Sequence, residues 1–226
     1  MYNYVSNAIV KPMRSFSADK LNQVKQMLKS EYNLDSNFFL VGSGAKNLVT
    51  QNGNEPFDLD WNFEIYNLAD PTKNASWLKN TIMDFLNEIM KDTPFRNCQD
   101  STAVITSRWI TKQGLKFSFD IAILVLNSNS TFCRMIHNKH MNRYYWNEVP
   151  NSKAVYEKMD YLKEHGWWQN VRSTYLKKKN MYLKRMESMQ HPSFNIFVET
   201  INEVWNKAIN SPNTCISPTC SKNCLF

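Results

Sequence analysis

The sequence lacks the features of a membrane or secreted protein. It contains no run of 18 apolar residues, and a membrane-spanning helix needs about 20 predominantly apolar residues. The N-terminus reads MYNYVSNAIV, without a basic segment followed by an apolar one, so a secretory signal is not indicated. We therefore expect a cytoplasmic protein that does not bind a membrane.

A disulfide framework is missing as well. The five cysteines are an odd number. Cys98 and Cys133 lie far apart, whereas Cys215, Cys220 and Cys224 crowd the C-terminal end. These spacings fit reduced thiols in the cytoplasm better than a set of bridges. The last three cysteines also lack the paired short spacings of a zinc knuckle.

The composition is that of a basic globular protein. Hydrophobic residues make up 42% of the chain and charged residues 21%, which is enough for a packed core. Lys and Arg outnumber Asp and Glu by 27 to 20, a net charge of +7. Such a chain attracts polyanions, including nucleic acids and nucleotides. Charge alone is equally compatible with a soluble protein that has no such partner.

Hydrophobic periodicity predicts an α/β (α+β) fold for residues 1–127. The last two strands of this region are joined by the short turn Thr111–Gly114, which predicts a hairpin. We expect helices at 17–32 and 76–91, and strands at 38–41, 58–65, 103–110 and 115–126.

The rest of the chain has a different texture. We expect a helical C-terminal domain over residues 128–210, with most of its helix between 150 and 209 and an interruption at Pro192. Residues 211–226 are predicted to be a mobile tail, because they hold little that could pack.

Three aspartates carry the strongest chemical signal. Asp58 and Asp60 are two residues apart on a predicted strand, so their carboxylates share one face of the sheet. Asp120 lies on a later strand between the small residues Ser118 and Ala122. Neighbouring carboxylates repel unless a cation lies between them, and oxygen ligands suit Mg²⁺. If the two strands are adjacent, three carboxylates converge; otherwise these are three exposed aspartates.

A Gly-Ser pair precedes the first two aspartates. Gly42 lets the backbone approach a phosphate closely, and Ser43 offers a hydroxyl and an N–H group. Lys46, three residues further along, either contacts a triphosphate or is solvated.

Together, the segments VGSGAKNLV, FDLDWNFEI and KFSFDIAIL resemble the polymerase-β-like nucleotidyltransferases over residues 38–126. The resemblance implies a mixed, mainly antiparallel sheet with flanking helices. It also implies that Gly42 and Ser43 bind the triphosphate of an NTP substrate. It implies that Asp58, Asp60 and Asp120 are catalytic residues holding Mg²⁺ or Mn²⁺, and that the third helps to deprotonate the acceptor. Fourteen residues separate Ser43 from Asp58, which is more like the template-independent branch that includes cyclic-oligonucleotide and oligoadenylate synthases.

Other candidate sites have ordinary structural explanations. Lys177–Lys179, between Tyr175 and Tyr182, could hold a triphosphate or an RNA backbone, but a solvated helix face is the simpler interpretation. Trp167 and Trp168 could stack on a base, although large aromatic residues in helices usually belong to a core.

A zinc site is a further possibility. Cys133, His137 and His140 would share a face if this segment were helical. No fourth ligand lies nearby, so we favour a structural role. Glu64 follows Asp60 on the same strand face and could support the carboxylates or be a surface residue.

The sequence thus predicts a two-metal nucleotidyltransferase that moves an NMP from an NTP to an acceptor hydroxyl and releases pyrophosphate. The acceptor could be RNA, a small hydroxylated molecule or a protein side chain. The alternative is a non-catalytic nucleotide- or nucleic-acid-binding protein that relies on its basic helices. No pattern indicates the oligomeric state.

Overall fold

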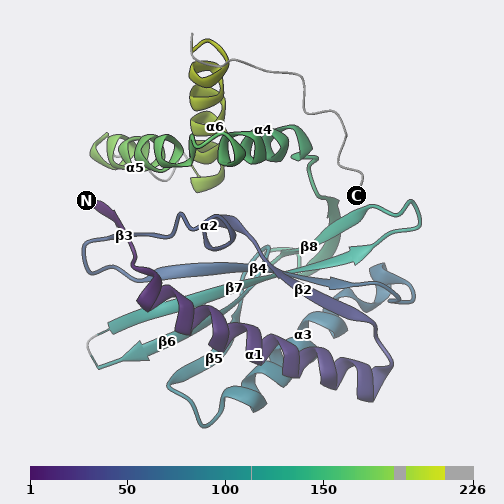
Figure 1. Cartoon of the computed structure of the whole chain (residues 1–226). Helices are drawn as coiled ribbons and strands as arrows, with labels where there is room; N and C mark the ends of the chain where they lie inside the picture. Colours follow the sequence, from purple (N-terminus) through teal and green to yellow (C-terminus); the bar gives the residue numbers. More distant parts are fainter. Residues whose placement is uncertain (113, 186–191, 212–226) are drawn as a thin grey trace, which may run out of the picture. The chain divides into compact units, whose positions relative to one another are not determined.

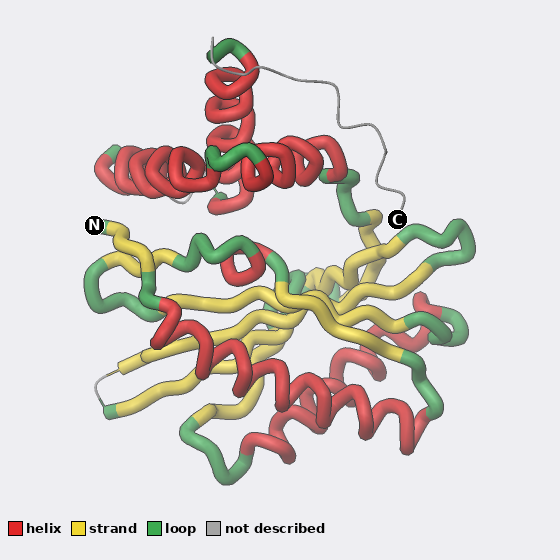
Figure 2. The backbone as a smooth tube through the Cα atoms, viewed as in Figure 1, coloured by secondary structure: helices red, strands yellow, loops and turns green. Residues whose placement is uncertain are grey.

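The computed structural model describes residues 1–112, 114–185 and 192–211. The chain forms two compact units, Met1–Asn151 and Ser152–Phe226. Figures 1 and 2 show a sheet with helices in the first unit and helices without a sheet in the described part of the second. Within the described ranges, no helix has both the length and the apolar character that crossing a membrane requires.

A seven-stranded sheet is the frame of the first unit. Its main path runs β2-β4-β7-β6-β5, and β8 and β9 extend it from β7. Only the β4–β7 pair is parallel among these pairings, which confirms the mixed, mainly antiparallel sheet. The strands are β2 (Ser36–Leu40), β4 (Phe57–Ile65), β5 (Phe95–Asp100), β6 (Ile105–Thr111), β7 (Gly114–Leu126), β8 (Phe132–Asn138) and β9 (Arg143–Glu148).

A short second sheet pairs β1 (Tyr2–Tyr4) with β3 (Thr50–Asn52) in antiparallel fashion. Of these two strands, neither was predicted from the sequence. Each has three residues, too few for a hydrophobic period to be recognised.

Two long helices cover one face of the large sheet. They are α1 (Asn7–Tyr32) and α3 (Pro71–Met90), and Figure 1 shows both on the same side. Alternation along β4 explains this face, since every second residue is apolar and buried. The shared core includes Leu21, Leu28, Leu59, Phe63, Leu78, Ile82 and Phe119. The polar residues of β4 therefore project from the opposite face.

Local signals set the ends of these helices. Asp70 caps α3 by accepting a hydrogen bond from the Lys73 backbone N–H at 3.3 Å, and Pro71 occupies the first turn. Asn33 ends α1 in the left-handed conformation, with φ at 53°. Helix α1 begins ten residues before the predicted start at residue 17, because Pro12 lies within it and argues against helix in a sequence-based prediction.

The second unit is a group of three helices, as predicted for residues 150–209. They are α4 (Lys153–Glu164), α5 (Trp168–Lys184) and α6 (Ser193–Ile209). Their buried residues include Leu162, Val171, Tyr175, Ile201 and Val204.

The prediction of helix directly after residue 127 is wrong. Strands β8 and β9 lie there and belong to the sheet of the first unit, which extends to Asn151. In β8, Cys133, Met135 and His137 are buried and alternate with half-buried residues. Arg134 and His137 hide this period of two, because polar residues occupy both faces. The predicted tail, except Ser211, and Cys215, Cys220 and Cys224 lie outside the described residues.

Candidate active site

The three aspartates converge on the face of the sheet opposite α1 and α3. Asp60 of β4 is directly paired with Asp120 of β7, and Asp58 is paired with Ser118. One carboxylate oxygen from each aspartate lies within 4.8 Å of the other two. The condition for convergence, that the two strands are adjacent, is therefore met, whereas the metal-binding and catalytic roles stay predictions.

Burial and mutual repulsion make this cluster electrostatically unfavourable. Burial, with smaller contributions from Asp58 and Asp120, raises the pKa of Asp60 to about 7. Burial also raises the pKa of Asp120, and a hydrogen bond from Thr106 opposes this shift. Side-chain carboxyls in water have pKa values near 4. The cluster thus favours protons or another source of positive charge.

A divalent cation fits these residues. Asp120 Oδ1 is buried and has no hydrogen-bond partner among the described residues, and an unpaired buried acceptor is costly. Three carboxylates and no histidine or cysteine form a hard oxygen donor set, which suits Mg²⁺ or Mn²⁺. Asp58, Asp60 and Asp120 would hold the ion.

The Gly-Ser turn lies directly against Asp60. It forms the short helix α2 (Gly42–Ala45), and the preceding Val41 N–H donates to the Asp60 carbonyl at 2.8 Å. Gly42 has φ at 60°, and a Cβ atom added there would lie 2.2 Å from Asp60 Oδ2. Only glycine fits this position without displacing a carboxylate of the cluster.

Lys46 is buried beneath this turn. It is 7% exposed, and its Nζ donates to the Gly42 carbonyl at 3.0 Å. Its charge lowers the pKa of Asp60, against the larger effect of burial. The interpretation of Lys46 as a solvated side chain is therefore wrong. Its contact with a triphosphate remains a prediction.

Comparison with known proteins supports this picture at the level of structure. No known family profile and no curated sequence match the chain. Escherichia coli MS115-1 CdnC, solved with ATP, superposes with a TM-score of 0.56 at 15% identity, over 89% of this chain and 62% of CdnC. Vibrio cholerae DncV cyclic AMP-GMP synthase, solved with the linear intermediate 5′ pppA(3′,5′)pG, gives 0.57 at 8% identity, over 88% of this chain and 68% of DncV.

Escherichia coli DncV, in its 3′-deoxy GTP bound form, gives a TM-score of 0.55 at 10% identity, over 88% of this chain and 68% of that protein. The chain shares the fold of these nucleotide-bound structures. It spans less than two thirds of CdnC.

Several residues around the carboxylate cluster were not identified from the sequence. Arg14 of α1 donates to the Gly44 carbonyl at 2.9 Å and so holds the turn from the helix side. Thr106 of β6 is paired with Asp120, and Arg108 is paired with Ser118. Arg108 lowers the pKa of Asp120, as does Arg134 of β8 for Asp60. A β-bulge shifts the β6–β7 register between Trp109 and Ile110, so continuing the pairing from the turn at Thr111–Gly114 would have aligned Thr106 with Phe119 instead of Asp120.

Cys133, His137 and His140 do not form a metal site. The segment is a strand, and His140 lies in the exposed turn after it. The His137 ring contacts Asp100 through Nδ1 at 2.6 Å and Asn142 through Nε2 at 3.3 Å. The three residues are not among the metal-ligand clusters that the described part of the chain contains. The structural role that we favoured from the sequence agrees with these contacts.

The basic run in α5 is largely engaged within the helical unit. Lys178 lies 3.2 Å from Glu203 and 3.5 Å from Glu199. Lys179 donates to Ser193 Oγ at 3.1 Å. Lys177 is exposed. At least two of the three lysines therefore stabilise the packing of α5 on α6.

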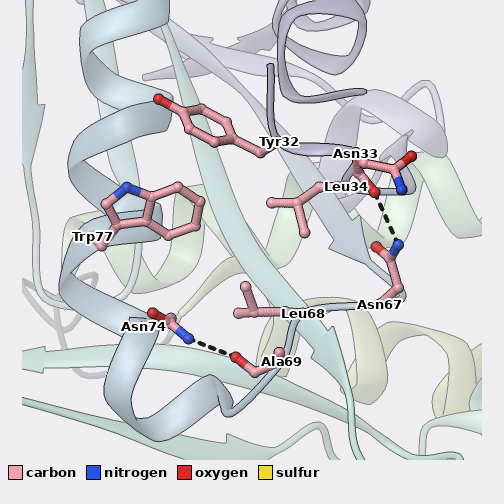
Figure 3. A pocket seen from close by; sticks show the side chains of 8 residues that line it. All are labelled: Tyr32, Asn33, Leu34, Asn67, Leu68, Ala69, Asn74 and Trp77. Carbon is pink, nitrogen blue, oxygen red and sulfur yellow. Dashed lines mark hydrogen bonds between the residues drawn. The ribbon is translucent and has the colours of Figure 1, made fainter. Parts of the chain in front are cut away.

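A separate cleft of about 460 Å³ lies on the helix-covered side, between the end of α1 and the start of α3. Tyr32 and Trp77 face each other edge-on at 5.0 Å, and Figure 3 shows them lining it. Two side-chain amides that line the cleft are already hydrogen-bonded to the backbone, since Asn67 donates to the Asn33 carbonyl and Asn74 to the Ala69 carbonyl. The carboxylates, which lie on the other face, are the better candidate for chemistry.

Proposed function

We propose that the chain is a Mg²⁺-dependent nucleotidyltransferase that moves an NMP from an NTP to an acceptor hydroxyl and releases pyrophosphate. The observation that carries the proposal is the convergence of Asp58, Asp60 and Asp120 beside a Gly-Ser turn. Carboxylates alone would repel a triphosphate, so this arrangement is useful only with a cation between them. When bound, the metal ions supply positive charge to the reacting phosphate and its leaving oxygen.

The residues of the chain have separable tasks in this proposal. The acceptor oxygen forms a bond to the α-phosphorus, the bond to the bridging oxygen breaks, and pyrophosphate leaves with the electron pair. Asp120 receives the acceptor proton, because its raised pKa brings it closer to the range of a general base. Gly42 and Ser43 hold the triphosphate, and buried Lys46 stabilises the turn and its charge.

The likeness to CdnC and DncV supports the choice of an NTP as the donor, since those proteins were solved with ATP, with GTP analogues or with a dinucleotide intermediate. The acceptor is open to RNA, to a small hydroxylated molecule and to a protein side chain. The chain covers only part of CdnC, so its product is not inferred from that protein.

The test is transfer of label from each α-³²P NTP, with Mg²⁺ or Mn²⁺, to a pool of RNA and cell metabolites. We expect the wild-type chain to label an acceptor and the Asp58→Ala/Asp60→Ala variant to label none while remaining folded. Equal labelling by both proteins would refute the proposal. Nucleotide or RNA binding without transfer under every condition would favour the non-catalytic binding protein.

A further inference from the structure

The carboxylate face of the sheet is ordered in rows that cross the strands. In one row, Asp60 and Asp120 lie next to Thr106. The next row along β4, two residues further and about 7 Å away, contains Asn62, with Phe39 of β2 on one side and Ala122 of β7 on the other. Because side chains alternate along a strand, this row projects from the same face as the carboxylates.

Phe39 is unusual for its place in the sheet. It is 46% exposed, whereas its neighbour Phe38 packs on Trp61 and Phe63 on the helix-covered face. An exposed aromatic ring on a sheet face is a stacking platform for any planar ring, and base stacking on aromatic side chains is worth roughly a 5- to 100-fold gain in affinity per base.

Asn62 lies directly beside this ring, as the paired residue on β4. Its half-buried side-chain amide has no hydrogen-bond partner within the part of the chain that the structure describes. An amide carries one acceptor and two donors, and it can pair with two adjacent groups on the edge of an adenine.

We propose that Phe39 and Asn62 form a nucleobase subsite that selects adenine for a nucleotide whose phosphates lie at the carboxylates. The inference rests on the proposed function, because it takes the adjacent row as the place of the phosphates. Phe39 stacks on the base, and Asn62 reads the donor and acceptor groups of its edge. The subsite thereby makes ATP the preferred nucleotide.

The test compares a nucleotide with a ligand that has no base. Binding of α,β-methylene-ATP, α,β-methylene-GTP and tripolyphosphate is measured by calorimetry in Mg²⁺, for the full chain and its variants. We expect Phe39→Ala to weaken binding of the ATP analogue about tenfold and to leave tripolyphosphate binding unchanged. Phe39→Tyr should restore the affinity, since it retains the ring. Trp77→Ala is the matched control, an exposed aromatic residue of α3 on the other face.

Asn62→Leu tests the choice of base. We expect it to reduce the preference for the ATP analogue over the GTP analogue by about tenfold. The subsite is refuted if Phe39→Ala binds the ATP analogue with wild-type affinity. It is also refuted if Phe39→Ala weakens binding of tripolyphosphate as much as binding of the ATP analogue. An unchanged preference in Asn62→Leu would overturn the assignment of adenine. A wild-type chain that binds neither nucleotide nor tripolyphosphate would instead refute the proposed function, and this inference with it.

Discussion

Asp60 and Asp120 are directly paired across two parallel strands, and each has a raised pKa in the folded chain. Burial is the larger cause for both, and Asp58 adds to it through its charge. The pair therefore destabilises the folded state locally, and the rest of the structure compensates for this cost. Such sites are commonly functional.

The first prediction concerns pH and stability. The folded pKa of Asp60 is raised from 3.8 to about 7, so its protonated form favours the folded state. The contribution of Asp60 to the free energy of unfolding should be most favourable below pH 4. It should fall by a few kcal/mol as the pH rises toward 7. Asp60→Asn should remove most of this loss. Urea denaturation in EDTA between pH 4 and pH 8 measures it, with exposed Asp84→Asn as control. Equal pH slopes in all three proteins would contradict the prediction.

The second prediction concerns Gly42. Gly42→Ala combines an unfavourable φ with a Cβ atom 2.2 Å from Asp60 Oδ2. Gly53→Ala has nearly the same φ, 56°, and meets nothing within 4 Å, so it reports backbone strain alone. Strain of this kind costs about 1 to 2 kcal/mol. We expect Gly53→Ala to lose that much stability and Gly42→Ala to lose more, because of the added contact with Asp60. Of the two variants, Gly42→Ala alone should lose Mn²⁺ binding, measured by electron paramagnetic resonance. Normal Mn²⁺ affinity in Gly42→Ala would show that the turn does not constrain the carboxylates.

The third prediction concerns the hydroxyl of Thr106, a residue paired with Asp120 across β6 and β7. The hydroxyl opposes the rise in the pKa of Asp120 and lies 3.4 Å from Ser101 Oγ. Residues that orient metal ligands commonly contribute about 10- to 100-fold to metal affinity. Thr106→Val keeps the shape and removes the hydroxyl, so Mn²⁺ affinity should fall by about tenfold. Thr106→Ser keeps the hydroxyl and should bind Mn²⁺ like the wild type. Equal Mn²⁺ affinities of Thr106→Val and Thr106→Ser would show that the hydroxyl has no positioning role.

The fourth prediction contrasts Asp100 with Asp60. Asp100 forms an ion pair with Lys79, which is 2% exposed, and a hydrogen bond with His137 Nδ1 at 2.6 Å. Burial raises its pKa, but hydrogen bonds from Lys79 and His137 outweigh that effect and lower it. The ionised Asp100 carboxylate therefore stabilises the folded chain at pH values above its unfolded pKa, and this stabilisation is lost as the pH falls.

Asp100→Asn should therefore destabilise the chain by about 3 to 5 kcal/mol at pH 7, because it leaves the Lys79 ammonium buried without a counter-ion. Asp60→Asn should stabilise it at the same pH. Parallel urea titrations of the two variants give the comparison. A decrease of less than 1 kcal/mol in the free energy of unfolding of Asp100→Asn would show that the Lys79 amine is neutral or is hydrated in that variant.

The sequence was sufficient to place each of the three aspartates on a strand, because that signal is local, whereas their convergence depended on the pairing of β4 with β7. A period of two in β4 places Asp58 and Asp60 together, and the apolar flanks of Asp120 indicate a strand. The sequence was insufficient where polar residues occupy both faces of a strand, as at Arg134 and His137 in β8. Hydrophobic alternation cannot be recognised there.

Contacts that depend on register or on tertiary packing were also out of reach. Thr106 meets Asp120 only through the pairing of β6 with β7. Arg14 reaches the Gly44 carbonyl from a helix 30 residues away in sequence. Neither contact leaves a pattern in the residues near it, so both had to be seen in the folded chain.

The parallel pairing of β4 with β7 also dictates when the site can come into being. Residues 66–113, with α3, β5 and β6, separate the two strands, and parallel neighbours cannot be joined by a hairpin. Asp58 and Asp60 therefore leave the ribosome well before their partner strand. Contacts of such long sequence separation form late and slow the folding of a domain. A nascent chain that ends before β7 carries two of the three carboxylates and lacks the third, so the proposed metal site is complete only near the end of folding of the first unit.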